Sequence, residues 1–276
     1  MSATKPVRII QISDLHCGSR YHIPSLASRV IDELNEAKPD MVVVTGDLTD
    51  EGFRQEFKQA HRLLSRLECQ NRMVLLGNHD ARNVGDEHFA EFFGPRSQEL
   101  RQGCVRMLGI DSSEPDLDAG RVGRNRYRWI EQRFSDSDET KIFAMHHHLV
   151  PVPNTGRERN IVYDAGDVLK TLSRCGTDIV LCGHKHVPNI WRLEGMLIVN
   201  AGTACTHRLR GRVRPCYNII EVLDGSRVRI LLKEPYSDPV LMADYLAPER
   251  RRFGWRIEGS EDLPAEQDAV DVETPR

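Results

Sequence analysis

Short apolar runs alternate with amphipathic stretches along most of this chain. Several of the runs are apolar through their whole length, which is typical of strands covered on both faces. They predict strands that begin at Val7 (VRIIQIS), Met41 (MVVVTG), Met73 (MVLLG), Val105 (VRMLGID), Ile142 (IFAMH), Ile179 (IVLCG), Leu197 (LIVNAG), Tyr217 (YNIIEV) and Arg227 (RVRILLK).

Between these runs, apolar residues recur at helical spacing. The stripes are Leu26, Val30, Ile31 and Leu34; Phe53, Phe57, Ala60, Leu64 and Leu67; Tyr127, Ile130 and Phe134; and Val168, Leu169 and Leu172. Alternation of strands and helices in the first two thirds predicts an α/β fold with a largely parallel sheet. After Leu197 the strands follow one another more closely, which favours antiparallel pairing and leaves room for a second sheet.

The pattern fades beyond about Lys233, so we expect one domain over residues 1–235 and a C-terminal extension over residues 236–276. The end of this extension, from about Gly259, is strongly acidic and has few large apolar residues. Such a composition predicts a disordered tail.

Composition narrows the class of protein. Hydrophobic residues make up 39%, charged residues 29%, and the formal net charge is -3, so no global positive field attracts nucleic acid or acidic membrane. No apolar run reaches the length of a signal peptide or a membrane span. Seven cysteines without a CxxC pair argue against a disulfide framework or a zinc ribbon and favour the cytoplasm. The basic stretch RLRGRVR from Arg208 keeps nucleic acid as a possible but not favoured partner. A homodimer is a further possibility.

Polar side chains follow the predicted strands at the point where each strand ends. They are Asp14 and His16; Asp47 and Asp50; Asn78, His79 and Asp80; His146, His147 and His148; and His184 and His186. The carboxyl ends of parallel strands share one edge of a sheet, where ligands bind. The sequence therefore predicts that these distant segments meet in one crevice.

Carboxylate, imidazole and carboxamide side chains suit manganese, iron or zinc better than a calcium or magnesium cage built of oxygen alone. There are enough ligands for two ions if one carboxylate bridges them. The spacings Asp-x-His and His-x-His fit an extended segment, in which residues i and i+2 point the same way.

The segments SDLH, GDLTD, GNHD, MHHH and GHKH resemble the ordered motifs of the calcineurin-like metallophosphoesterases, over a span from about Val7 to Val222. The segment DSSEPDLDAGRVGRNRYRWI from Asp111 resembles class III cyclic nucleotide phosphodiesterases. The resemblance implies a four-layer α-β-β-α sandwich with two mixed sheets.

The resemblance also implies roles for single residues. One ion would be held by Asp14, His16, Asp47 and His186, and the other by Asp47, Asn78, His146 and His184. Manganese or iron is favoured at both sites, with zinc as the alternative. His79 would protonate the leaving oxygen, and Asp50 would orient His79. For Asp80, a turn or helix cap is as plausible as a catalytic role.

One motif departs from the family pattern. Family members often read His-His-Pro-Pro where this chain reads HHHLVP. We align His146 with the metal ligand because it directly ends the apolar run, and His147 would take its place if the strand ended one residue later.

The implied function is a phosphodiesterase in which two divalent ions and a bridging hydroxide hydrolyse a small phosphodiester, with a 3′,5′-cyclic nucleotide as the leading substrate. Alternatives are a nuclease, a phosphodiesterase acting on other nucleotides or lipid headgroups, and a phosphomonoesterase. A scaffold that has lost catalysis should lack several ligands, whereas every position is filled here. A redox or zinc-structural protein is disfavoured because most cysteines lie outside the strand-end cluster.

Overall fold

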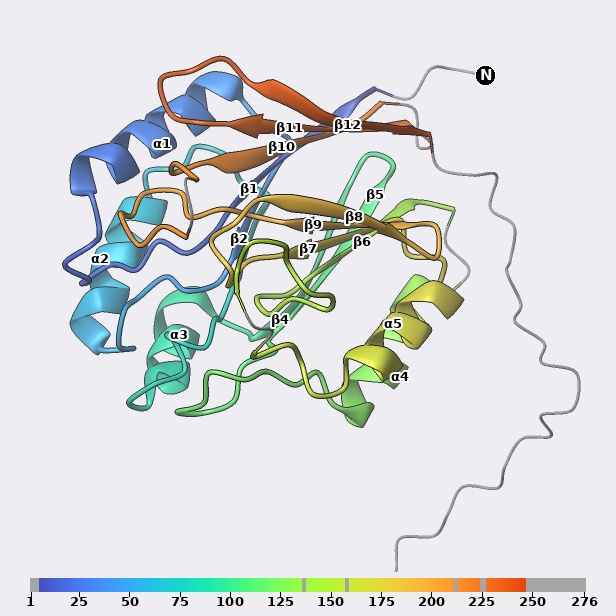
Figure 1. Ribbon diagram of the computed structural model, residues 1–276, viewed down its shortest axis with the longest axis horizontal. Helices are drawn as coiled ribbons and strands as arrows, with labels where there is room; N and C mark the ends of the chain where they lie inside the picture. The colour runs from blue at the N-terminus through green and yellow to red at the C-terminus, as the bar shows by residue number, and fades with distance from the viewer. Residues whose placement is uncertain (1–4, 136–137, 157–158, 211–212, 224–226, 247–276) are drawn as a thin grey trace, which may run out of the picture.

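In the computed structural model, two six-stranded sheets lie face to face with helices on their outer sides (Figure 1). The structure describes residues 5–135, 138–156, 159–210, 213–223 and 227–246. The helices are α1 (Pro24–Ala37), α2 (Arg54–Leu64), α3 (Gly85–Phe93), α4 (Arg124–Phe134) and α5 (Ala165–Arg174).

The first sheet has a parallel half and an antiparallel half. Its order is β12 (Val240–Leu246), β11 (Arg227–Lys233), β10 (Tyr217–Val222), β1 (Val7–Ile12), β2 (Met41–Thr45) and β3 (Arg72–Leu75). The pairs β1–β2 and β2–β3 are parallel, and the pairs from β1 through β10 and β11 to β12 are antiparallel.

The second sheet is parallel at its centre and antiparallel at both edges. Its order is β4 (Ser97–Gln102), β5 (Val105–Ile110), β6 (Thr140–Ala144), β7 (Ile179–Cys182), β9 (Met196–Asn200) and β8 (Asn189–Leu193). Only the edge pairs β4–β5 and β8–β9 are antiparallel. Both sheets are thus mixed.

The two-residue alternation of the central strands separates three apolar cores. In β1, Ile9 packs between the two sheets, whereas Ile10 and Ile12 pack against α1, α2 and α3. On the far side, Phe143 of β6 packs with Phe134 of α4. Since each sheet is covered on both faces, the layers run α-β-β-α, and the predicted sandwich of two mixed sheets is confirmed.

Every strand and helix that the apolar pattern predicts is present in the structure. The pattern missed α3 and the three strands β4, β8 and β12. These strands lie at sheet edges and are polar or partly exposed, for example SQELRQ in β4, so they lack the continuous apolar signal of buried strands.

The last strand, β12, lies beyond the domain boundary that we expected at residue 235, and it extends the first sheet to Leu246. The predicted tail from Gly259 lies outside the described residues. None of the helices in the described part of the chain has the length and apolar character needed to cross a membrane.

A buried carboxylate joins α1 to the antiparallel half of the first sheet. Glu33 is 4% exposed and accepts hydrogen bonds from the Tyr217 hydroxyl at 2.8 Å and from the Tyr236 amide at 2.8 Å. Arg29 lies 2.8 Å and Lys233 3.3 Å from its oxygens. Burial opposes ionisation, but the Tyr236 amide, the Tyr217 hydroxyl and Arg29 together lower the pKa of Glu33.

Replacing Glu33 by Gln should lower the free energy of unfolding at pH 7 by about 1.5–3 kcal/mol, because buried donors lose a charged acceptor. A lowered pKa in the folded state stabilises the fold above the unfolded pKa, and this contribution disappears as pH falls through the folded value. Urea unfolding at pH 7 and below pH 4 should therefore show a difference between wild type and E33Q that shrinks in acid. An equal difference at both pH values would contradict this assignment.

Candidate dinuclear metal centre

The strand ends of both sheets meet at one rim. The loops after β1 and β2 are joined by hydrogen bonds from the Asp14 amide to the Gly46 carbonyl at 3.0 Å and from the His16 amide to the Asp47 carbonyl at 2.9 Å. In the second sheet, the Gly183 amide after β7 donates to the His146 carbonyl after β6 at 2.8 Å. The predicted convergence of these segments is therefore present.

One group of donors brings together Asp14, His16, Asp47 and His186, whose ligand atoms all lie within 4.8 Å of one another. His186 Nε2 lies 3.1 Å from Asp14 Oδ1 and 3.1 Å from His16 Nε2. His16 Nε2 lies 3.7 Å from Asp47 Oδ2. This is the set that the sequence resemblance assigned to one ion.

A second group of donors forms around Asp47, His146 and His184, and Asn78 lies among them. His146 Nε2 lies 3.3 Å from Asp47 Oδ1, and Asn78 Oδ1 lies 3.1 Å from His146 Nε2 and 2.9 Å from His184 Nδ1. Asp47 presents Oδ2 to the first group and Oδ1 to the second. It therefore occupies the position that a bridging carboxylate requires.

Five of the candidate ligands have a strained backbone conformation. The φ angles are 56° at Asp14, 45° at His16, 51° at Asp47, 71° at His184 and 57° at His186. Residues other than glycine rarely adopt this left-handed region, and such strain clusters at functional sites. The extended geometry that we expected for Asp-x-His and His-x-His is wrong, because left-handed turns rather than strand alternation direct these side chains.

The unpaired atoms of the cluster fit divalent cations. Asp14 Oδ1 and His16 Nδ1 are buried and make no hydrogen bond, although His186 Nε2 lies 3.1 Å from Asp14 Oδ1. In addition, ring nitrogens of His146 and His184 face each other at 3.2 Å. Buried lone pairs that converge in this way are stabilised when they coordinate a metal ion. The donor set of carboxylate, imidazole and amide oxygen suits manganese, iron or zinc.

Protonation in the cluster follows from burial and charge. Burial lowers the pKa of His16 to about 4 and that of His184 well below its ordinary value, so both rings are neutral, which is the form that binds metal. Burial would also lower the pKa of His146, but the Asp47 charge raises it to about 9. In the same way His146, followed by His79, lowers the pKa of Asp47 despite its burial. The buried carboxylate thus requires a cationic partner.

Main-chain and carboxylate acceptors orient several of the candidate ligands. His146 Nδ1 donates to the Thr45 carbonyl at 2.7 Å, and His186 Nδ1 donates to the Arg208 carbonyl at 2.6 Å. Each ring therefore turns Nε2 toward the cluster. Asn78 Nδ2 donates to Asp118 Oδ1 at 3.2 Å, which turns the amide oxygen toward the same place.

The histidines that follow His146 differ from it in their contacts. His147 pairs through Nδ1 with the Ser112 hydroxyl at 2.9 Å and through Nε2 with the Asp118 carbonyl at 3.2 Å. Both of its ring nitrogens are thus occupied outside the two donor groups. The ring of His148 stacks on that of His184, with centroids 5.5 Å apart. We therefore keep His146 as the proposed ligand.

His79 lies beside the first donor group rather than within it. Its Nδ1 donates to the Asp50 main-chain carbonyl at 2.5 Å, and its Nε2 lies 3.1 Å from Arg208 Nη1. The Asp50 carboxylate is 3.9 Å from His79 Nδ1 but 3.6 Å from His16 Nδ1. The carbonyl of Asp50 thus holds His79 Nδ1, while its carboxylate lies between His79 and His16. The role of Asp50 in orienting His79 for catalysis stays a prediction.

Asp80 has a structural position that the sequence did not reveal. Its buried carboxylate accepts hydrogen bonds from the amides of Leu48 at 3.0 Å, Thr49 at 2.8 Å and Gly77 at 2.9 Å, and from the Thr49 hydroxyl at 2.7 Å. Burial and the Asp47 charge nevertheless raise the pKa of Asp80 to about 7. Asp80 thus ties the loop after β3 to the loop after β2, neither capping a helix nor entering the cluster.

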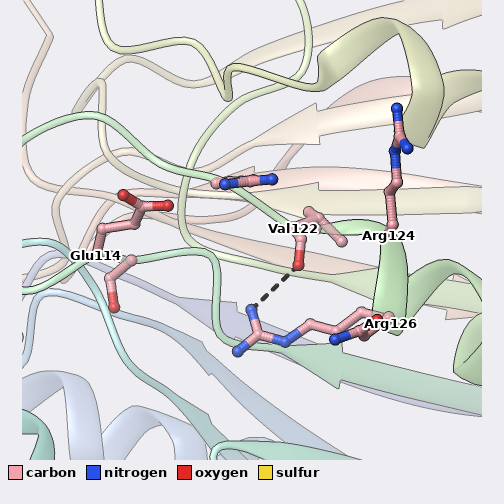
Figure 2. Close-up of a pocket in the computed structure, with 8 residues that line it drawn as sticks. Glu114, Val122, Arg124 and Arg126 are labelled. Carbon is pink, nitrogen blue, oxygen red and sulfur yellow. Dashed lines mark hydrogen bonds between the residues drawn. The ribbon is translucent and has the colours of Figure 1, made fainter. Parts of the chain in front are cut away.

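A separate cavity of about 470 Å³ opens beside the first turn of α4. Figure 2 shows the hydrogen bond from Arg126 to the Val122 carbonyl. Arg124 points away from this bond, and Glu114 lies on the side opposite to Arg124 and Arg126. None of the candidate metal ligands lines this cavity. The residues that line this cavity come from the same segment as Ser112 and Asp118, which reach the group of candidate ligands.

Sequence comparison agrees with this geometry. The family model for calcineurin-like phosphoesterases matches residues 7–188, and the chain belongs to this family. The resemblance drawn from the strand-end motifs is therefore confirmed, and the expected enzyme class, a metal-dependent phosphoester hydrolase, agrees with it.

Similar proteins with curated names include phosphodiesterases. A probable cyclic nucleotide phosphodiesterase of Psychrobacter sp. is 27% identical over 173 residues, which cover 58% of this chain and 51% of that protein. The glycerophosphodiester phosphodiesterase GpdQ of Enterobacter lignolyticus is 27% identical, with 64% of this chain and 70% of that protein covered. A 3′,5′-cyclic-nucleotide phosphodiesterase of Nostoc sp. is 22% identical, and the match covers 87% of this chain and 97% of that protein. The chain thus matches about half of the Psychrobacter protein.

Solved structures share the fold at lower identity. A dimetal phosphatase from Danio rerio superposes with a TM-score of 0.66 at 12% identity, covering 88% of this chain and 99% of that one. A purple acid phosphatase from yellow lupin gives a TM-score of 0.67 at 15% identity, covering 88% of this chain and 53% of that one. These likenesses establish the fold alone.

Replacing Gly77 by Ala should displace Asp47, because the added Cβ would lie 2.2 Å from Asp47 Oδ1 and 2.3 Å from its amide nitrogen. We expect a loss of bound metal and a cost in unfolding free energy of about 1–3 kcal/mol. Metal analysis and urea unfolding measure the two effects.

The matched control is Gly166→Ala in α5, where the added Cβ meets nothing within 4 Å. It should leave metal content unchanged and stability equal or slightly higher. Full metal content in G77A would show that Asp47 is not held by this close approach.

Proposed function

We propose that this chain is a phosphodiesterase that depends on two divalent ions and hydrolyses 3′,5′-cyclic nucleotides at the cluster around Asp47. The observation that carries the proposal is the position of Asp47, which offers one oxygen to each of two donor groups. Asp14, His16, Asp47 and His186 would hold one ion. Asp47, Asn78, His146 and His184 would hold the other, with manganese or iron favoured and the cytoplasm as the expected compartment.

Bound at these positions, the ions would supply Lewis acidity toward the phosphoryl oxygens and a water molecule of lowered pKa. The protein's own residues orient the substrate and move protons. His79 Nδ1 donates a hydrogen bond to the Asp50 carbonyl, so Nε2 is the ring nitrogen that would take part in proton transfer. From there His79 would give a proton to the departing alkoxide oxygen.

Substrate would enter from the side of His79. The ligands Asp14, His16 and His146 are fully buried, whereas the side chains of Asp50 and Arg208 are 25% and 40% exposed. The exposed edge of the cluster is therefore the edge at which Nε2 of His79 lies. The diester preference is supported by the Psychrobacter, Enterobacter and Nostoc relatives, all of which are named as phosphodiesterases.

Replacing His79 by Ala should reduce kcat by about 10²–10⁴-fold, which is the usual contribution of a general acid. Bound metal should be retained, because His79 belongs to neither ligand set. Steady-state kinetics with manganese and metal analysis of the same sample measure both. Loss of metal in H79A would move His79 from proton transfer to metal binding.

A substrate panel tests the activity itself. With manganese we expect the chain to prefer 3′,5′-cyclic AMP or bis-p-nitrophenyl phosphate over p-nitrophenyl phosphate, and Asp14→Ala serves as the metal-deficient control. Preference for the monoester would refute the diesterase assignment. Preference for a glycerophosphodiester would favour the activity for which the Enterobacter relative is named. Salt-sensitive cleavage of single-stranded DNA would favour a nuclease.

A further inference from the structure

A cationic side chain that belongs to none of the strand-end motifs lies against His79. Arg208 Nη1 is 3.1 Å from His79 Nε2 and 3.5 Å from Asp50 Oδ1. His79 Nε2 is the atom that would face the leaving oxygen of a substrate. The guanidinium of Arg208 thus lies directly beside Nε2 of His79.

The main chain around Arg208 is fixed against the metal cluster. The loop after β9 is attached to the first sheet by the Ala204 amide, which donates to the Ser13 carbonyl at 3.1 Å. Arg208 itself donates its amide to the Thr206 hydroxyl at 3.1 Å and accepts from His186 Nδ1 at 2.6 Å. The side chain therefore extends from an anchored position at the rim.

The guanidinium has donors left for an anion. Its contacts with His79 at 3.1 Å and with Asp50 at 3.5 Å are both made by Nη1, and the contact with Asp50 is longer than that of a bidentate pair. The described residues offer no hydrogen-bond partner to its Nε or Nη2. An arginine that is 40% exposed and engaged only through Nη1 is suited to bind a phosphoryl oxygen with the remaining donors of its fork.

We propose that Arg208 is a substrate-binding residue whose guanidinium holds a non-bridging oxygen of the scissile phosphate at the mouth of the Asp47 cluster. This inference rests on the proposed function and adds to it the residue that receives the phosphate. When the guanidinium turns from His79 to the phosphate, Nε2 of His79 is left facing the leaving oxygen.

The test compares Arg208→Ala, Arg208→Lys and the control Arg210→Ala in the manganese-loaded full chain. Arg210 is exposed in the same loop and has no contact with the cluster among the described residues. Metal analysis, calorimetric binding of inorganic phosphate and hydrolysis of bis-p-nitrophenyl phosphate are measured on each protein.

We expect R208A to keep its metal, because the carbonyl that His186 uses is unchanged. Its phosphate Kd and its KM should rise by about 10- to 100-fold, as befits the loss of a hydrogen bond to a charged group. R208K should recover part of this affinity, since it keeps the charge without the fork, and R210A should match wild type.

Phosphate binding by R208A equal to wild type would overturn the proposal, as would loss of metal in R208A or a wild-type chain that binds no phosphate. The outcomes that would refute the proposed function differ from those that would refute the role of Arg208. If wild type hydrolyses no phosphodiester but its phosphate affinity depends on Arg208, the activity is wrong and the anion site stands. If wild type is active and R208A is unaffected, the activity stands and the role of Arg208 is wrong.

Discussion

The rest of this structure depends on a buried carboxylate at the meeting point of two sheets. Asp47 is 1% exposed, and histidines from both sheets face its two oxygens. A charge at this depth is unstable unless positive charge or metal ions surround it. The left-handed turns at Asp14, His184 and His186, the close approach of Gly77 and the loop clamp of Asp80 all serve to bring partners to this carboxylate.

The sandwich architecture explains why so many distant segments reach Asp47. Parallel strands in the centre of each sheet end at the same rim, and the apolar layer between the sheets holds the two rims together. The antiparallel strands lie mainly at the edges, where they extend the sheets without contributing a candidate ligand. The strands and the apolar layer thus stabilise the fold, whereas the loops at the strand ends carry the candidate ligands. This division is common when a site is built on a rigid scaffold.

Much of this arrangement could be predicted from the sequence, because buried strands such as MVVVT at Met41 carry a continuous apolar signal and the candidate ligands follow them directly. Edge strands such as β12 carry a weaker signal and were missed. Sequence also does not reveal which atom of a residue acts. Asp50 contacts His79 Nδ1 through its main-chain carbonyl, and Arg208 reaches His79 only because the loop after β9 folds back onto the first sheet.

The central claim is that Asp47 links two cation sites, and the direct measurement is the number of manganese ions bound per chain. Elemental analysis of the dialysed, manganese-saturated protein should give two ions for wild type, and Asp47→Asn should reduce occupancy at both positions. One ion per wild-type chain, or two ions that persist in D47N, would contradict the account.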